Sequence, residues 1–182
     1  MKYAALLIAC LCAIQSKDVT AATRVGRPMI IHRLSVMNLE IWTEQDPEWE
    51  TSLKQSATAL TFSAETPALA YPPAHMSWTI APRMKFQDGE LEDAARGVLY
   101  QMALNYRTLP PEQLIEAQYG ELTGYEATFQ AEPRNVPVDV HVFFGHREGM
   151  PMVVMQVVTL RGKLAHLAEH VRRSWTHLRY LE

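Results

Sequence analysis

The spacing of His166, Glu169 and His170 is the first feature of this sequence that could support chemistry. These residues match the H-x-x-E-H pattern, in which two histidines bind zinc and the glutamate activates a water molecule. A catalytic zinc needs a further protein ligand, and only 12 residues follow His170. On a helical wheel these two histidines, with Arg173 and His177, lie opposite an apolar stripe that we expect to face the core. The stripe comprises Leu164, Leu167, Ala168, Val171, Trp175 and Leu178. We therefore expect a solvent-facing stripe and no metal, with a metal-dependent hydrolase as an alternative.

Other signatures of catalysis do not occur in the sequence. There is no G-x-S-x-G nucleophile elbow, no Walker-type phosphate loop and no dinucleotide fingerprint. The two cysteines are Cys10 and Cys12, so residues 23–182 contain no thiol. The formal net charge of −3 argues against a nucleic-acid binder, which would carry a basic patch or stripe. We expect a protein without enzymatic activity or cofactor that binds a protein partner and no nucleic acid.

Two polar segments carry the residues that we predict to bind this partner. The first is acidic and lies between two tryptophans, and the second is the polar tip of a hairpin loop at 132–137. Aromatic side chains next to charges are typical of hot spots in protein interfaces. The predicted partner-binding residues are Trp42, Asp46, Glu48, Trp49, Glu132 and Arg134. A solvated loop is the alternative for each segment, and a calcium site in the first would lack the EF-hand order of ligands.

Residues 1–22 have the composition of a signal peptide. Lys2 supplies a positive charge, and Ala4–Ile14 is an apolar stretch of 11 residues. This stretch is shorter than the roughly 20 residues that span a bilayer. A lipoprotein signal is an alternative because Leu7-Ile8-Ala9-Cys10 has the shape of a lipobox, and Cys10 would then carry the membrane anchor; an uncleaved anchor is another. A cysteine-free exported domain suits the bacterial periplasm.

Hydrophobic periodicity divides residues 23–182 into strands and two helices, which predicts a single α+β domain. Apolar residues recur at helical spacing over 90–107 and over 163–180. Strands are expected over 28–37, 39–42, 57–63, 75–81, 114–122, 124–131, 136–145 and 152–160. The last of these is apolar on both faces, so we expect it to be central in the sheet. The polar segment 43–55 contains Pro47 and is expected to be a loop.

The order of these elements resembles a known fold. A helix opened by Asp88-Gly89-Glu90-Leu91, the segment Leu122–Ala127 and a closing helix with Ser174-Trp175 are similar to the PsbP-like fold. DcrB-type periplasmic proteins and the Eag chaperones of type VI secretion effectors have this fold. The resemblance covers residues 57–182. It implies an antiparallel sheet with helices packed on it and no catalytic residues.

The resemblance also implies a function in binding. Proteins of this fold act as adaptors, chaperones or partner-binding subunits. Eag chaperones are cytoplasmic, and the leader at residues 1–22 departs from that pattern. We therefore expect a periplasmic immunity protein that neutralises a secreted, type VI-type effector by occluding it. The alternative is a DcrB-like envelope lipoprotein that supports assembly or transport.

Overall fold

The computed structural model describes residues 28–81 and 90–181. The expected signal segment at 1–22, Cys10 and the helix-opening residues Asp88 and Gly89 lie outside the described residues. Within the described ranges, no helix has the length and apolar character that crossing a bilayer requires.

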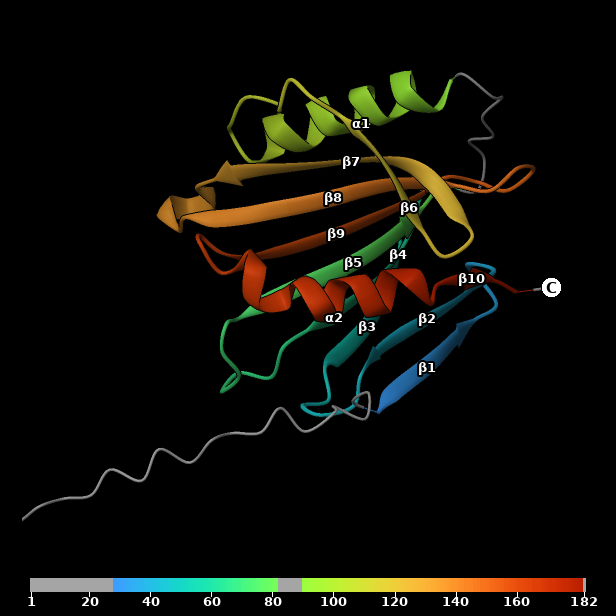
Figure 1. The fold of residues 1–182 in the computed structure, drawn as a ribbon, viewed down its shortest axis with the longest axis horizontal. Coiled ribbons are helices and arrows are strands. Elements are labelled where there is room, and N and C mark those ends of the chain that lie inside the picture. Colours follow the sequence, from blue (N-terminus) through green and yellow to red (C-terminus); the bar gives the residue numbers. More distant parts are fainter. Residues whose placement is uncertain (1–27, 82–89, 182) are drawn as a thin grey trace, which may run out of the picture.

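Seven antiparallel strands form the main sheet, in the order β3-β4-β5-β9-β8-β7-β6 (Figure 1). Their bounds are β3 Glu50–Gln55, β4 Leu60–Glu65, β5 Ala74–Ile80, β6 Ile115–Tyr119, β7 Leu122–Ala131, β8 Val138–His146 and β9 Val153–Leu160. As predicted from its apolar faces, β9 lies inside the sheet, between β5 and β8. Gly149, in the turn between β8 and β9, has a φ of 77°, which glycine adopts without steric cost.

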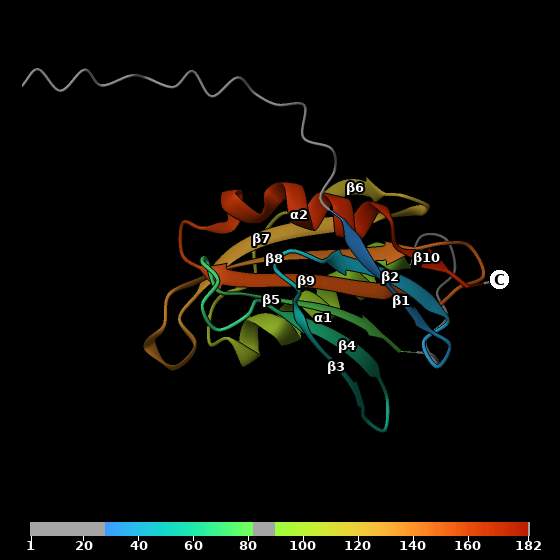
Figure 2. The same cartoon turned by 90° about the horizontal axis from the view of Figure 1, so that it is seen from below.

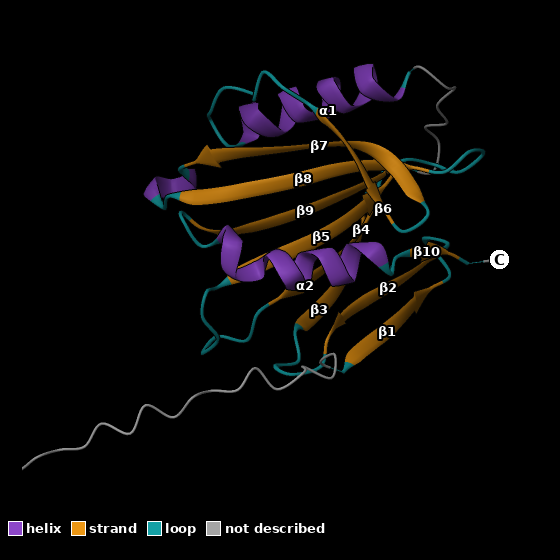
Figure 3. Cartoon of the chain, viewed as in Figure 1, coloured by secondary structure: helices purple, strands orange, loops and turns teal. Residues whose placement is uncertain are grey.

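A smaller antiparallel sheet and two helices complete the fold. The small sheet has the order β1-β2-β10, with β1 at Met29–Leu34, β2 at Leu39–Glu44 and β10 at Arg179–Tyr180. The helices α1 (Leu91–Asn105) and α2 (Leu164–Thr176) cover opposite faces of the main sheet (Figure 3). The α2 helix also contacts β2, so it joins the two sheets. The predicted α+β class, an antiparallel sheet with helices packed on it, is therefore confirmed.

The alternation of side chains along β8 divides the core into two layers. Val138, Val140 and Val142 point towards α1 and pack with Ala95 and Leu99. The intervening side chains point to the other face because successive residues of a strand alternate. There the α2 helix buries Val171 and Trp175 against residues of β5, β8 and β9, namely Met76, Trp78, Phe143 and Met155. The same alternation places His141 on the α2 face of the sheet.

Two of the predicted elements are wrong in extent. Residues 43–55 are not a loop, because β2 continues to Glu44 and β3 begins at Glu50. All six residues of β3 are exposed, so this edge strand has no apolar alternation that could reveal it. The C-terminal helix ends at Thr176 and not at residue 180, and Arg179–Tyr180 pairs with β2 instead. Leu178 and Tyr180 are buried in that extended segment, although Leu178 also fits a helical period.

The predicted orientation of α2 is wrong for part of its surface. His166 and His177 are exposed, as expected, but the side chains of His170 and Arg173 are only 10% and 17% exposed. The small sheet covers this side of the helix, and the sequence pattern of the helix alone does not show a second layer. Ala168, which we expected in the core, is exposed on the opposite flank of α2.

Candidate functional site

A groove of about 700 Å³ lies between α2 and the strands β6, β7 and β8. Figures 1 and 2 both show β6 beside α2 at this position. The helix contributes a mostly aliphatic wall, formed by Leu164, Ala165, Ala168, Val171, Arg172 and Thr176. The strands contribute the floor and the other wall, formed by Ala117, Gln118, Tyr119, Glu126, Thr128 and His141. The groove therefore offers an apolar side and a polar side to one ligand.

Three side chains from three strands form a hydrogen-bonded network in this groove. The Tyr119 hydroxyl donates to Glu126 Oε2 at 2.7 Å, and His141 Nε2 lies 3.1 Å from the same oxygen. Burial, together with the hydrogen bond to Glu126 and its charge, raises the pKa of Tyr119 well above its usual value. The hydroxyl therefore keeps its proton at neutral pH and acts as a donor, which leaves Glu126 as the acceptor.

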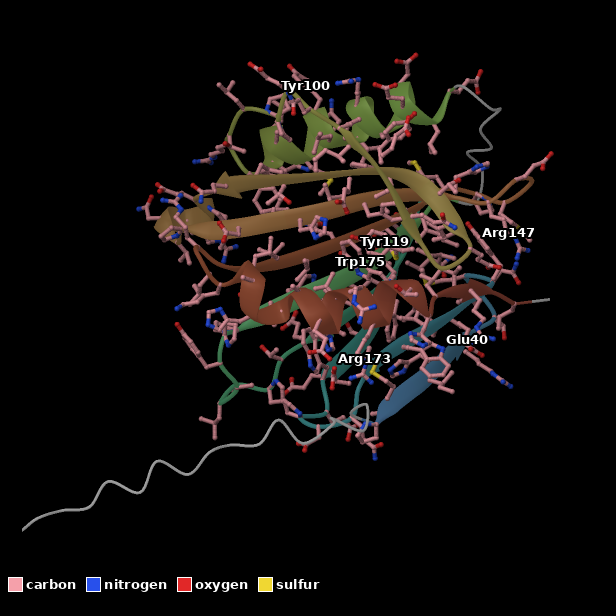
Figure 4. All side chains as sticks on the ribbon, viewed as in Figure 1. Glu40, Tyr100, Tyr119, Arg147, Arg173 and Trp175 are labelled. Carbon is pink, nitrogen blue, oxygen red and sulfur yellow. The ribbon has the colours of Figure 1, made fainter. Side chains whose placement is uncertain are left out.

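Local sequence explains how Tyr119 reaches Glu126. Ala117 and Gly124 face each other across β6 and β7, so no large side chain stands between the tyrosine and the glutamate. Gly124 has a second role, because a Cβ atom there would collide with the backbone carbonyl of Phe144. Trp175 and Phe143 support the Tyr119 ring from below, with ring centroids 5.2 and 4.8 Å away; Figure 4 shows Tyr119 next to Trp175.

The protonated Tyr119 hydroxyl limits the chemical roles that this residue can take. A raised pKa makes Tyr119 a poor base and a poor nucleophile, since both roles need the phenolate. In the described part of the chain, no serine or threonine hydroxyl is hydrogen-bonded to His141, as an activated nucleophile would be. The Glu126 carboxylate is held in position by its two neighbours, Tyr119 and His141.

The acidic segment between the tryptophans forms the connection from β2 to β3. Asp46 and Glu48 are exposed, and Gln45 and Glu48 form an isolated β-bridge. Trp49 is 5% exposed and stacks on the His170 ring, with ring centroids 4.4 Å apart. It therefore packs the connection against α2. Trp42 is half-buried, and its Nε1 donates to Glu40 at 3.0 Å.

The other two predicted partner-binding residues lie elsewhere. Glu132 and Arg134 are exposed at the tip of the β7–β8 hairpin, where η1 (Pro133–Asn135) forms a short helical turn (Figure 3). Glu132 pairs with Arg161 at 3.0 Å, and Arg134 has a φ of 54°. Figures 1 and 2 show this tip apart from the β2–β3 connection. The structure therefore does not bring the two predicted segments together, and neither lines the groove.

His170, the last residue of the H-x-x-E-H pattern, has a structural role on the flank of α2 that faces the small sheet. His170 Nδ1 and Arg173 both contact Glu44 Oε1, at 3.1 and 3.3 Å. Next to them, the Ser174 hydroxyl donates to the Trp42 carbonyl. The described residues contain no group of three or more histidine, cysteine, aspartate or glutamate side chains that could hold a metal ion. This cluster attaches α2 to β2.

The groove residues were not identified from the sequence because they are far apart along the chain. Tyr119, Glu126 and His141 lie on three strands, and only the pairing of those strands makes them neighbours. One signal was available in β7, where the polar residues Glu126, Thr128 and Gln130 alternate with Ala127, Phe129 and Ala131. In this strand, the polar side faces the groove.

No family model and no curated protein matches this sequence. Two solved structures are similar in fold. PA94 of Pseudomonas aeruginosa, a protein of unknown function proposed as a regulator, matches with a TM-score of 0.51 and 13% identity, over 86% of this chain and 99% of PA94. A Bacteroides thetaiotaomicron protein matches with a TM-score of 0.50 and 10% identity, over 79% of this chain and 45% of its own. This chain thus spans less than half of the Bacteroides protein, and at these identities the likeness defines the fold alone.

Proposed function

We propose that this chain is an exported, non-enzymatic protein of the bacterial periplasm that binds a protein partner in the groove between α2 and β6. The observation that supports this proposal is the groove itself, which joins an aliphatic helix wall to a floor of fixed polar groups. Ligand sites commonly have this composition, mostly apolar with a few placed polar groups that set orientation. The exposed residues Asp46 and Glu48 remain predicted contacts at a second, separate surface.

The specific form of this function is neutralisation of a toxin. The resemblance to the PsbP-like fold of DcrB-type proteins and Eag-type chaperones suggests a partner from a type VI-type secretion system. As a periplasmic immunity protein, this chain would occlude the secreted effector by steric cover, without chemistry. A complex of that kind buries about 1,200–2,000 Å² in total, so the groove would be the centre of a wider interface.

Site-specific photocrosslinking from the groove tests the proposal. A photoreactive amino acid replaces Ala168 on the groove wall, and in a matched control it replaces Gln101, which is exposed on α1. In the full-length chain expressed in its bacterial host, we expect a protein crosslink from position 168 and none from position 101. Expression of the captured protein alone should then inhibit growth, and co-expression of this chain should relieve the inhibition. Equal crosslinking from both positions contradicts the proposal.

A DcrB-like envelope lipoprotein is the second candidate, because Leu7-Ile8-Ala9-Cys10 has the shape of a lipobox. This candidate predicts that cells incorporate labelled palmitate into the chain and that Cys10→Ser abolishes the label. A cleaved, unlabelled protein in the periplasmic fraction supports simple export instead.

A further inference from the structure

The backbone of β6 is open on one side. This strand is the last of the seven-stranded sheet, so it has a neighbour, β7, on one edge only. Tyr119 and Leu122 face each other across the two-residue turn that joins β6 to β7. The two residues that flank such a turn form a hydrogen-bonded pair. Along an antiparallel ladder, hydrogen-bonded pairs alternate with pairs whose backbone groups point away from the neighbouring strand. The N–H and C=O groups of Glu116 and Gln118 therefore point away from β7, and Gln118 lines the groove.

An open edge of this kind is suited to receive another strand. Edge strands present rows of unpaired backbone groups, and extended peptides commonly bind by adding to them. The β6 edge lies beside the groove, so one face of an added strand would direct its side chains into the groove. The occupant that this geometry fits is an extended protein segment.

Glu126 gives the groove a negative charge with a free oxygen. Tyr119 and His141 both contact Oε2, and Oε1 has no hydrogen-bond partner among the described residues. The side chain is 25% exposed and lines the groove, so Oε1 is open to a ligand. No lysine or arginine within residues 28–81 and 90–181 forms an ion pair with Glu126. Arg172, on the helix wall, is the cation that shares the groove.

The distance across the sheet selects the length of the incoming side chain. Neighbouring strands lie about 4.8 Å apart, so a strand added beside β6 lies about 10 Å from β7, which carries Glu126. Short polar side chains do not cross that distance. Lysine and arginine have long aliphatic stems that can lie along the apolar wall while the charged group reaches the carboxylate.

From these observations we infer that the partner enters the groove as an extended segment, pairs with β6, and places a lysine or arginine against Glu126 Oε1. This inference rests on the proposed function of the groove and adds the chemistry of the group that is recognised. Glu126 acts as the acceptor, Tyr119 and His141 hold it in place, and the aliphatic face of α2 packs against the stem.

A titration with short peptides tests this inference. The probe is N-acetyl-Val-Thr-Lys-Thr-Val-amide, whose blocked ends leave one charge, and the comparison peptides carry norleucine or glutamate in place of lysine. The ¹⁵N-labelled exported protein is observed by NMR. We expect the lysine peptide to shift the amides of Glu116 and Gln118 and to bind at least about tenfold more tightly than either comparison peptide, since the charge-assisted bond is worth about that factor.

Two variants of the same protein distinguish recognition of the lysine charge from backbone pairing with β6. Glu126→Gln keeps an acceptor for Tyr119 and should remove the preference for lysine, while the peptide still shifts the β6 amides. Glu50→Gln is the matched control, because this exposed residue lies on β3, at the opposite edge of the main sheet, and should leave the preference unchanged. Equal binding of the lysine and norleucine peptides overturns the inference, as do shifts confined to another strand edge or no binding at all. Concentration-dependent shifts of these amides without peptide would also overturn it, because β6 would then pair with a second copy.

The captured partner distinguishes failure of this inference from failure of the proposed function. If Ala168→Arg abolishes partner binding and Glu126→Gln leaves it unchanged, the groove binds the partner but does not recognise a cation. If neither substitution affects partner binding, both proposals are wrong.

Discussion

Glu40 shows how single charged groups fix the small sheet in place. Its carboxylate accepts hydrogen bonds from Trp42 Nε1 and from Arg33 Nε, each at 3.0 Å, and Arg179 lies 3.9 Å away. The side chain is 11% exposed. The hydrogen bond from Trp42, followed by the contributions of Arg33 and Arg179, lowers the pKa of Glu40 below its usual value. The charged form of Glu40 therefore stabilises the contact between β1, β2 and β10.

Replacement of Glu40 by glutamine should make this stabilisation visible through its pH dependence. A lowered pKa in the folded state means that the contribution is present above the unfolded pKa of about 4.5 and is lost as the pH falls through the folded value. We expect Glu40→Gln to lower the free energy of unfolding by about 1 kcal/mol at pH 7, because neutral hydrogen bonds replace charge-assisted ones. The difference should shrink steadily below pH 4.5 in urea unfolding curves. A difference that stays constant down to about pH 2 contradicts this assignment.

Substitutions at Trp49 and at its acidic neighbours should affect stability differently. Because Trp49 is buried against His170, Trp49→Ala should cost about 3–5 kcal/mol of stability in denaturant unfolding. Asp46→Lys and Glu48→Lys change exposed positions and should alter stability by less than about 0.5 kcal/mol. If Trp49→Ala instead folds as stably as the wild type and loses partner binding, Trp49 is an interface residue, as the sequence suggested.

At the level of residues, the sequence predicted chemistry poorly. In its clearest pattern, His166 to His170, the structure gives a role to His170, which contacts Glu44 and so attaches α2 to the small sheet. The pattern could not show this contact, because Glu44 lies far earlier in the chain. The groove network was not predicted because Tyr119, Glu126 and His141 become neighbours only through strand pairing. Spacing along one helix can be read directly, whereas proximity across strands depends on the register.

The turn between β6 and β7 shapes one end of the groove. Gly120 has a φ of 58°, and a Cβ atom there would collide with the carbonyl of Thr176 at the end of α2. The glycine thus allows the turn to pass close beneath the helix. Substitution here tests whether the contact between this turn and α2 holds the groove together.

We expect Gly120→Ala to destabilise the protein by about 2 kcal/mol or more, since it adds left-handed backbone strain to a backbone collision. Gly97→Ala is the matched control, because Gly97 lies within α1 and a Cβ atom there would meet no neighbouring group within 4 Å. That substitution should stabilise by about 0.5–1 kcal/mol, the usual cost of glycine inside a helix. Thermal unfolding of both variants checks the pair, and equal destabilisation would contradict the account of the turn.

At the level of elements, periodicity predicted most of the fold. The helix at 90–107 and the hairpin at 136–160 carry long, regular apolar patterns, and α1, β8 and β9 lie within a few residues of the predicted bounds. The strand β3 was missed because all of its residues are exposed, and β10 because two residues are too few to show a period. Elements stabilised by pairing alone leave little trace in the hydrophobic pattern.

At the level of the whole molecule, the α2 helix lies between the small sheet and the groove. One flank of α2 is buried against the small sheet, and the other flank faces the groove. The sequence predicted the class of the fold but not the second sheet, because contacts between β2 and α2 join residues at opposite ends of the chain.

The affinity for the captured partner tests the central claim, that the groove is the binding site. The dissociation constant is measured for the wild type, for Ala168→Arg and for Gln101→Arg, which adds the same side chain at an exposed site on α1. Because Ala168 is exposed on the groove wall, arginine should fill the groove without changing the melting temperature. We predict that Ala168→Arg weakens binding at least about tenfold, a loss of about 1.4 kcal/mol or more, and that Gln101→Arg leaves it unchanged. Wild-type affinity in Ala168→Arg, or an equal loss in both variants, would contradict the claim.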